Sequence, residues 1–426
     1  MIPLRFVVSR VFSEVVPVTT AVHPGDALSR AERLTYIVVL GALTALGPFT
    51  IDLYLPALPV LERELDVPTA AVQLTLTATM IGFAVGQLLV GPLSDQVGRR
   101  RPLLVATGLH IVACLAAALA PDLFWLGLAR VFQGFGAAAG AVVAMAMVRD
   151  LFGGYPLVKM LSRLALVSGL APVLAPVIGS QLLLAVDWRG LFVFLSIYGF
   201  LVLVATALFL RETLAPEARS VRGHSSVGQR YGALFRDRVY VGAVLIAGMN
   251  FSALFAYLSS SSFLFQDVYA LTPQQYGFLF GINSIGVVVG VQVSSRLQKH
   301  IGPQWIIAGA TILQLVSAVA IMVLDASGAG FFGIAIPLWL FIAGCGFNFP
   351  AISALALVKH GHEAGTAASV LGAMNFGVAG LVSPIVGLFT ITNAIPMGGV
   401  MVIAIVIAIV VLWTIVRPST VPPLEA

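Results

Sequence analysis

Long apolar stretches with few charges limit what this chain can fold into. Of its 426 residues, 59% are hydrophobic and only 10% are charged, against roughly 25% charged residues in soluble domains. A helix needs about 20 apolar residues to cross the core of a bilayer. Twelve stretches are of that kind: 34–59, 70–94, 102–121, 123–148, 157–186, 190–210, 239–266, 274–295, 303–324, 330–358, 364–391 and 394–416. We therefore predict an all-α integral membrane protein with twelve transmembrane helices.

The basic residues predict its orientation. Of the 23 lysines and arginines, all except Arg63, Arg130 and Arg189 fall on the side of the predicted spans that holds both termini. Positively charged loops tend to stay in the cytoplasm. Both termini should therefore be cytoplasmic, in a multi-pass protein of the cell membrane. The net charge of +5 follows from this arrangement, and we infer no nucleic-acid partner from it.

The longest polar interruption, 211–238, divides the spans six and six. Three glycines in the first part have counterparts 204 positions later in the second. The pairs are Gly82 and Gly286, Gly86 and Gly290, and Gly98 and Gly302. The repeat predicts two pseudo-symmetric six-helix halves around a central cavity near the bilayer midplane. The expected divisions are a cytoplasmic tail over 1–32, halves over 33–210 and 239–416, a cytoplasmic linker over 211–238 and a tail over 417–426.

Two charged residues lie inside predicted spans. Asp52 is the only charge between Leu34 and Pro59, and Arg130 lies within 123–148. A charge at membrane depth costs about 2.5–3.5 kcal/mol on insertion scales, and such residues usually mark ion or substrate pathways. Both residues lie at similar distances from the outer ends of their spans, so we expect an ion pair between them. The alternative for Arg130 is a side chain that extends to the outer interface.

The loop after the second span carries a dense motif, GPLSDQVGRRRP, over residues 91–102. Gly91 allows a close helix approach and Gly98 permits a tight reversal. Asp95 can cap a helix N-terminus or pair with a neighbouring arginine. A basic cytoplasmic loop alone would explain the arginines, but it would not explain an aspartate between two glycines.

This segment resembles the signature loop of the major facilitator superfamily, G-x-L-[SA]-D-x-x-G-R-R, at every specified position. The resemblance implies a twelve-helix transporter that works by alternating access. It also implies a conformational latch that holds the cytoplasmic side closed in the outward-facing state. The latch residues would be Gly91, Asp95, Gly98, Arg99 and Arg100.

The fourth predicted span resembles the R-x-x-Q-G motif of drug:proton antiporters in that superfamily. The matching residues are Arg130, Gln133 and Gly134, and the resemblance links the arginine to proton transfer. Gly136, followed by Gly140 and Ala144 at four-residue spacing, would let a neighbouring helix approach closely.

The fifth predicted span contains SGLAPVLAPVIGS over residues 168–180. It resembles the exporters' G-P-x-x-G-G motif at Pro176 and Gly179, with Pro172 one turn earlier. Prolines remove backbone hydrogen bonds and bend a helix, which suits a gating element. The resemblance favours efflux over uptake, and a bent packing helix without a directional role is the alternative.

Four further stretches narrow the resemblance to the bicyclomycin/chloramphenicol resistance (Bcr/CflA) group. They are residues 51–59, 149–150, 265–277 and 364–369. The resemblance implies that Asp52 carries the proton. Burial opposes the charged carboxylate and a nearby arginine favours it, so proton binding can be coupled to alternating access. A related group has a second acid two turns earlier, where this chain has Thr44. Fewer cationic substrates, or one proton per cycle, would follow.

The sequence thus predicts a proton-coupled multidrug efflux transporter for small amphipathic antibiotics such as chloramphenicol or bicyclomycin. An exporter of an endogenous metabolite and a proton-coupled uptake carrier remain open. An enzyme is disfavoured, because the aqueous segments contain no nucleophile–base set, metal-ligand spacing or phosphate loop. We expect no cofactor or metal, and a monomer in the lipid bilayer.

Candidate cavity residues are polar groups within the spans, which can instead bond between helices. They are Tyr54, Gln133, Asn250, Tyr257, Asn283, Asn348 and Asn375. Drug pockets are mostly apolar with a few placed polar groups, which fits Phe251, Phe255 and Phe347 nearby.

Overall fold

The computed structural model describes residues 23–219, 232, 234–298, 300–357, 364–389 and 391–421. Residues 1–22 and 422–426 of the predicted tails, and 220–231 and 233 of the predicted linker, lie outside the described residues.

The described residues contain twelve helices that are long and apolar enough to cross a membrane, as predicted. The first six spans are formed by α1 (Arg30–Asp52) with η2 (Leu55–Ala57) and α2 (Leu58–Leu65), α3 (Thr69–Val97), α4 (Arg100–Ala118), α5 (Leu123–Leu151), α6 (Gly154–Leu182) and α7 (Trp188–Phe209). The other six are formed by α9 (Arg238–Phe263) with η4 (Leu264–Val268), α10 (Pro273–Leu297), α11 (Pro303–Ala326), α12 (Gly330–Leu357), α13 (Ala364–Gly387) and α14 (Ile395–Val411) with η6 (Leu412–Val416).

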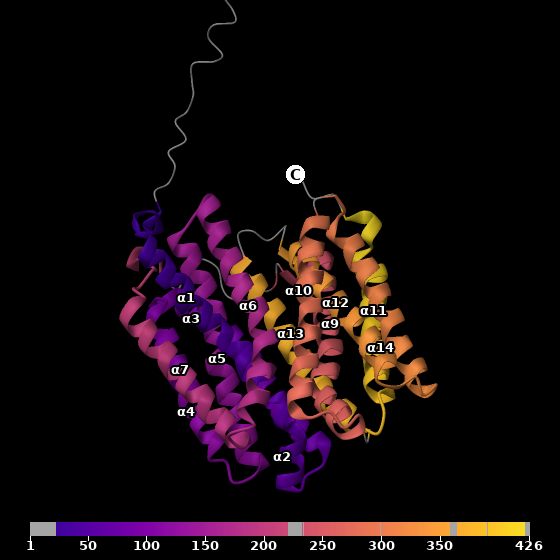
Figure 1. Cartoon of the computed structure of the whole chain (residues 1–426). Coiled ribbons are helices and arrows are strands. Elements are labelled where there is room, and N and C mark those ends of the chain that lie inside the picture. The colour runs from indigo at the N-terminus through magenta and orange to yellow at the C-terminus, as the bar shows by residue number, and fades with distance from the viewer. Residues whose placement is uncertain are drawn as a thin grey trace, which may run out of the picture.

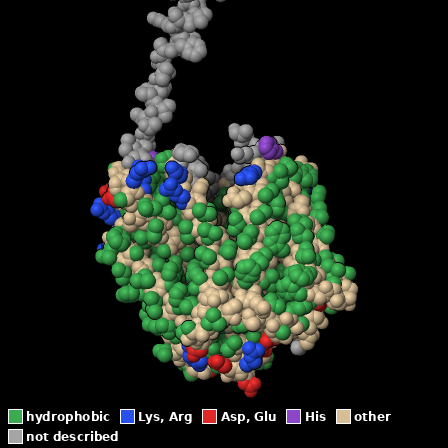
Figure 2. All heavy atoms as spheres, in the orientation of Figure 1, with side chains coloured by type: hydrophobic (Ala, Val, Ile, Leu, Met, Phe, Trp, Pro, Cys, Tyr) green, Lys and Arg blue, Asp and Glu red, His purple; other side chains and the backbone are tan. Residues whose placement is uncertain are grey.

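The helices form two groups that lie side by side. Figure 1 shows α1 to α7 in one half and α9 to α14 in the other, and the two halves meet where α3 packs on α13 and α6 packs on α10. We call the end where α7 stops and α9 begins the linker end, and the end that carries α2 the far end. In Figure 2, hydrophobic side chains cover the middle of the visible face and charged side chains gather at its two ends. The predicted twelve-helix fold in two six-helix halves is therefore confirmed.

The glycine repeat has a structural counterpart in how the helices pack. A Cβ on Gly82 of α3 would collide with the carbonyl oxygen of Val131 on α5, and a Cβ on Gly286 of α10 would lie 3.3 Å from the carbonyl oxygen of Trp339 on α12. Gly86 and Gly290, one turn further along, also meet backbone atoms of α5 and α12. Matched glycines thus allow matched helix contacts in the two halves, which supports the predicted duplication.

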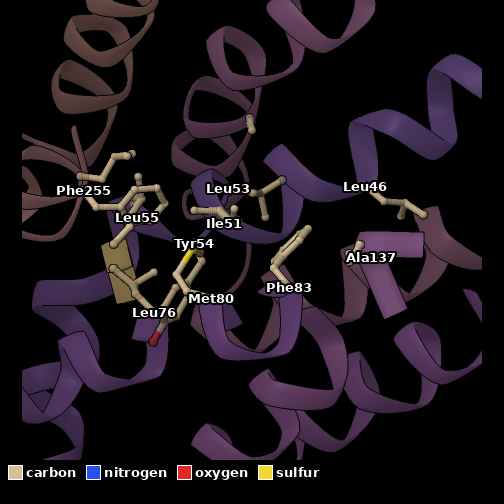
Figure 3. Close-up of a cluster of buried hydrophobic side chains, with 14 of the residues drawn as sticks. Leu46, Ile51, Leu53, Tyr54, Leu55, Leu76, Met80, Phe83, Ala137 and Phe255 are labelled. Atoms are coloured by element: carbon tan, nitrogen blue, oxygen red, sulfur yellow. The ribbon is translucent and has the colours of Figure 1, made fainter. Parts of the chain in front are cut away.

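The first span is not a continuous helix, and this differs from the uninterrupted span expected over 34–59. Helix α1 ends at Asp52, and a short 3₁₀ turn, Leu55–Ala57, precedes α2. Pro56 and Pro59 explain the break, since proline donates no backbone hydrogen bond and disfavours a helical residue before it. In Figure 3 the broken segment lies in a buried hydrophobic cluster, with Tyr54 beside Met80 of α3 and Leu55 beside Phe255 of α9.

Candidate functional site

Asp52 occupies the last position of α1, directly before the break, and only 6% of it is exposed. No ion pair joins its carboxylate to any of the residues that the structure describes. The carboxylate lies within electrostatic range of the hydroxyl groups of Tyr257 on α9 and Tyr276 on α10. Both tyrosines belong to the second half, so Asp52 lies where the two halves meet.

The predicted ion pair between Asp52 and Arg130 is wrong. The Arg130 guanidinium is fully buried, and its Nη1 donates to the Thr50 carbonyl oxygen at 2.9 Å and to the Gln133 Oε1 at 2.6 Å. Its Cζ lies 4.9 Å from the centre of the Tyr54 ring and 5.5 Å from that of Phe192. The bond to Thr50 agrees with the predicted equal depth. The pair is absent because these contacts hold the Arg130 guanidinium inside the first half. The alternative, an Arg130 side chain that extends to the outer interface, is also wrong, since the side chain is fully buried.

The glycines that follow Arg130 on α5 face three different helices. A Cβ on Gly134 would collide with the Thr79 carbonyl oxygen of α3, and one on Gly136 would lie 2.5 Å from the Ala106 carbonyl oxygen of α4. Gly140 lies against the Leu43 backbone of α1. The predicted close approach is thus confirmed, although the small residues contact several neighbours and not one.

Helix α6 brings the fifth-span motif to the break beside Asp52. Its Gly179 lies so close to the Leu53 carbonyl oxygen that a Cβ would collide with it. The other side of this segment meets the second half, because a Cβ on Gly277 of α10 would lie 2.9 Å from the Pro176 carbonyl oxygen. Pro172 and Pro176 both lie inside α6. The motif therefore connects the Asp52 segment to α10.

The signature loop forms a compact ion cluster at the linker end. The Arg99 side chain, 92% buried, pairs with Asp95 and with Asp150 at the end of α5, where the Nε to Oδ2 distance is 2.8 Å. Burial alone would lower the pKa of Arg99, but hydrogen bonds and charge interactions with Asp150 and Asp95 raise it above its ordinary value. All of these partners lie in the first half. Sequence reasoning noted Asp150 only as part of a resemblance and did not identify it as a partner of Arg99.

Glu212 is a second residue that sequence reasoning missed in this cluster. Its carboxylate accepts the backbone N–H groups of Arg99 at 2.8 Å, Arg100 at 3.2 Å, Thr213 at 3.1 Å and Leu214 at 3.0 Å. Partial burial alone would raise the pKa of Glu212, but these hydrogen bonds lower it overall. Glu212, the third residue after the end of α7, is thereby attached to the N-terminus of α4, which has no cap from its own N-cap side chain.

Gly98 makes room for this carboxylate. Its φ is +99° and ψ is 163°, a region that is essentially restricted to glycine. A Cβ at this position would also lie 2.5 Å from the Glu212 Oε2. Gly91, by contrast, faces Val142 of α5 and Ser369 of α13 at ordinary contact distances. Arg100 donates from Nη2 to the Ala207 carbonyl oxygen of α7 at 2.5 Å.

Hydrogen bonds join the two halves near the far end. The Arg63 Nη1 pairs with the Asp267 Oδ1 at 3.0 Å, and the Gln73 Nε2 donates to the Ser259 carbonyl oxygen at 3.0 Å. Three further bonds run from Thr77 to the Gly380 oxygen at 2.7 Å, from Gln266 to the Pro56 oxygen at 3.0 Å and from Gln274 to the Ser180 oxygen at 2.8 Å. These contacts close the far end between the halves.

Some of the candidate cavity residues lie near Asp52, and others are buried inside one half. The Tyr257 hydroxyl accepts from Asn283 at 3.1 Å and interacts electrostatically with the Asp52 carboxylate. Tyr54, in contrast, lies inside the first half with its hydroxyl 3.4 Å from that of Thr75. Asn250 and Asn348 are buried within the second half and bond to Gln314 at 2.8 Å each. Their substrate contacts stay a prediction.

Aromatic rings fill the place where the halves meet. Phe83 of α3 stacks on Phe376 of α13 with centroids 4.9 Å apart, next to the predicted residue Asn375. Phe251 lies 5.1 Å from Phe376, 5.2 Å from Phe255 and 6.1 Å from Phe349. We call these five phenylalanines the seam cluster. Phe347 lies elsewhere, in the wall of an apolar cavity of about 260 Å³ between α10, α11 and α12.

Comparison with known proteins gives one consistent family. The sequence model described as Major Facilitator Superfamily matches residues 39–384. The chain is 36% identical over 378 residues to the uncharacterized MFS-type transporter YdgK of Bacillus subtilis, covering 88% of this chain and 94% of the relative. It is 30% identical over 381 residues to the bicyclomycin resistance protein homolog of Haemophilus influenzae, with the same coverage. The solved xylose transporter XylE from E. coli, in a partially occluded inward open conformation, superposes with a TM-score of 0.74 at 13% identity, covering 93% of this chain and 99% of that one.

Proposed function

Because the chain belongs to the Major Facilitator Superfamily, we propose that it exports small amphipathic drugs across the cytoplasmic membrane in exchange for protons. The observation that carries the proposal is the buried carboxylate of Asp52 at the junction of the two halves. One similar protein is named as a homolog of a bicyclomycin resistance protein, which supports a drug as cargo. We further propose that the protein works as a monomer and has both termini in the cytoplasm.

Asp52 is suited to carry a proton because its surroundings come from both halves. Its backbone belongs to the first half, and the nearby hydroxyl groups of Tyr257 and Tyr276 belong to the second. A movement of one half against the other therefore changes how well the carboxylate is solvated. Burial penalises the charged form of a carboxyl group. Closure around Asp52 would favour the protonated acid, and opening to water would favour proton release.

The two ends of the molecule differ in how the halves are joined, and this difference supports alternating access. Hydrogen bonds such as Arg63 to Asp267 join the halves at the far end. At the linker end, the described side-chain bonds of Arg99 and Arg100 stay within the first half. A latch that closes the linker end would need new bonds from this cluster to the second half. We therefore propose that this state has its far side closed and faces the cytoplasm.

The proposed cargo contacts the seam cluster and the Tyr257–Asn283 pair. Offset or edge-on contacts between aromatic rings contribute about 0.5–1.5 kcal/mol beyond their burial, so the five phenylalanines would favour planar, uncharged drugs. The hydroxyl of Tyr257, which accepts from the amide of Asn283 at 3.1 Å, would supply a polar contact to the cargo. Chloramphenicol, with an aromatic ring and polar substituents, fits this description.

The test is a transport assay with purified protein in liposomes that contain a pH-sensitive dye. We expect drug-dependent proton movement under an imposed pH gradient for the wild type. Asp52→Asn should lose at least about 90% of it, since an amide cannot exchange the proton, while its far-UV spectrum and elution profile stay those of a folded protein. Asp66→Asn is the matched control. Asp66 lies at the far end with a φ of +49°, which asparagine tolerates, and it should behave like the wild type.

The outcomes separate the candidate functions. Proton movement that persists in Asp52→Asn would place the coupling group elsewhere. Uptake of a metabolite together with protons, in the absence of drug exchange, would establish a symporter instead. Proton exchange with a metabolite panel but with no drug would establish a metabolite exporter.

A further inference from the structure

Building on the proposed proton coupling, we propose that His110 and Cys114 of α4 are positioning residues that hold the Arg130 guanidinium. A closed chain of hydrogen bonds joins these three residues through Gln133. Neither His110 nor Cys114 belongs to any motif that the sequence showed, and both side chains are fully buried among helices. These two residues would keep Arg130 in place without a carboxylate partner.

The chain runs through four residues on two helices. The Arg130 Nη1 donates to the Gln133 Oε1 at 2.6 Å, and the Gln133 Nε2 donates to the Cys114 Sγ at 3.1 Å. The Cys114 Sγ lies 3.4 Å from the His110 Nε2, and the His110 Nδ1 lies 3.1 Å from the Gln133 carbonyl oxygen. The chain therefore begins at Arg130 on α5, crosses to α4 and returns to the backbone of Gln133.

The chemistry of the groups sets one direction for these bonds. A carbonyl oxygen only accepts, so the neutral His110 ring must carry its proton on Nδ1 and present Nε2 as an acceptor. The Cys114 thiol then donates to Nε2, which leaves its sulfur free to accept from the Gln133 amide. The amide oxygen of Gln133 must consequently point at Arg130. Each group thereby fixes the orientation of the next.

Arg130 depends on this arrangement because its other contacts are few. Its Nε and Nη2 have no hydrogen-bond partner among the described residues. Besides Gln133, the guanidinium has only the Thr50 carbonyl oxygen and the ring faces of Tyr54 and Phe192. A turned Gln133 side chain would present an amide N–H group to the cation. That reversal would push the guanidinium away from Thr50, two residues before Asp52.

Two glycines on neighbouring helices make room for His110. A Cβ on Gly136 of α5 would lie 2.8 Å from the His110 Cβ, and one on Gly199 of α7 would lie 3.2 Å from its Cδ2. Two glycines thus allow the imidazole to fit between α5 and α7. This gives Gly136 a specific role in seating a residue that acts through Gln133.

The second half contains a natural control for this chain. The Gln314 Nε2 donates to the Cys345 Sγ at 3.1 Å, the same distance as in the first half. Gln314 also accepts from Asn348 and donates to Asn250, so its amide belongs to a neutral network. The two cysteines of the chain therefore share one kind of contact, and only Cys114 is linked to a charge.

The first experiment tests the hydrogen bonds without transport. In the Cys345→Ala protein, Cys114 is the one remaining thiol, and its S–H stretching band can be measured by infrared spectroscopy. A thiol that donates to an imidazole should absorb at lower frequency than a free thiol. Replacing the ring in a His110→Phe, Cys345→Ala protein should return the band toward the free value. A band at the free-thiol frequency in the Cys345→Ala protein overturns the chain, whatever the protein transports.

The second experiment tests the link to proton coupling. We expect Cys114→Ala to lower the number of protons moved per drug molecule and to slow coupled transport about tenfold, as expected when a charged group is displaced, with equilibrium drug binding within about twofold of the wild type. Cys114→Ser keeps a donor and an acceptor and should restore most of the coupling. Cys345→Ala should leave coupling unchanged.

The outcomes distinguish this inference from the proposed function. Equal losses in Cys114→Ala and Cys345→Ala, or a loss in drug binding alone, would mean that the thiols merely pack the helices. Normal coupling in Cys114→Ala would overturn the positioning role. If the wild type moves no protons with any drug, the proposed function fails, while the infrared result still decides whether the chain exists.

Discussion

Gly179 of α6 lies directly against the carbonyl oxygen of Leu53, the residue that follows Asp52. The fifth-span motif therefore contacts the break in the first span at the point where a buried carboxylate emerges from α1. The same turn of α6 also meets Gly277 of α10 through Pro176 and Ser180, so it touches both the second half and the backbone beside Asp52. This contact gives the glycine of the motif a physical purpose.

Gly179→Ala should impair the protein, because its Cβ would collide with a backbone atom that cannot turn aside. Overpacking of this kind costs about 1–3 kcal/mol. We expect a lower melting temperature in detergent and a loss of transport. Gly169→Ala, ten residues earlier on the same helix, is the control, since no atom lies within 4 Å of its Cβ position. Equal behaviour of the two variants would contradict the close approach.

Gly98→Ala should destabilise the signature loop. The backbone of Gly98 has a φ of +99°, and a residue with a side chain held in this region costs roughly 1–3 kcal/mol. The added methyl would also displace Glu212 from the N-terminus of α4. Thermal unfolding measures the effect. Gly108→Ala, within α4 and with open space around it, should be neutral or slightly stabilising because alanine favours helix.

The cap formed by Glu212 should weaken in acid. Its pKa is lowered in the folded protein from an ordinary value of 4.5, since the charged carboxylate accepts backbone N–H groups. A lowered pKa means that the stabilisation is complete above the unfolded-state value and is lost as the pH falls through the folded-state value. Glu212→Gln should therefore cost about 1 kcal/mol, as for other helix caps, near pH 7.

The difference in stability between the wild type and Glu212→Gln should shrink as the pH falls below 4.5, where the wild-type carboxyl group gains a proton. Melting temperatures of both proteins across this range measure the change. Glu217→Gln is the control, because Glu217 is an exposed glutamate only five residues after Glu212. If the difference in melting temperature between the wild type and Glu212→Gln stays constant down to the lowest pH measured, the carboxylate charge contributes nothing to the cap.

The Arg63–Asp267 pair should make a small contribution to closure of the far end. Its side chains are 64% and 38% exposed, and exposed ion pairs typically contribute less than about 1 kcal/mol. Asp267→Asn should therefore shift the balance between the two access states by less than about fivefold. Distances between spin labels on the two halves report this balance. The exchanged variant Arg63→Asp, Asp267→Arg should recover the wild-type distribution, and a shift that does not recover would indicate a cause other than the ion pair.

The spans could be predicted from the sequence because the length of an apolar stretch is a local property. The depth of Arg130 was also predicted correctly, since Arg130 bonds to Thr50 and this residue lies two positions before Asp52. The direction of the two side chains could not be read in the same way. It depends on the break after Asp52 and on the Gln133 amide that receives the guanidinium.

The partners of Arg99 in the linker-end cluster could be identified only from the fold. Asp150 and Glu212 lie 51 and 113 positions from Arg99 in the chain, and their own neighbours in sequence contain no motif that would connect them to it. His110 and Cys114 are similar, because a polar residue in an apolar helix gives no sign of the helix that it faces. The motifs that could be recognised are runs of neighbouring residues, such as 91–102, 130–134 and 168–180.

The Arg63–Asp267 pair also bears on the origin of the molecule. The two residues are 204 positions apart, which is the offset between the repeated glycines. The ion pair thus joins two positions that the repeat offset makes equivalent. In an ancestral dimer of identical chains, both positions would have held the same residue, and two arginines or two aspartates would have repelled each other. An attraction between these two positions therefore requires two copies that differ in sequence, and a symmetric dimer of identical chains could not have closed its far end with this pair.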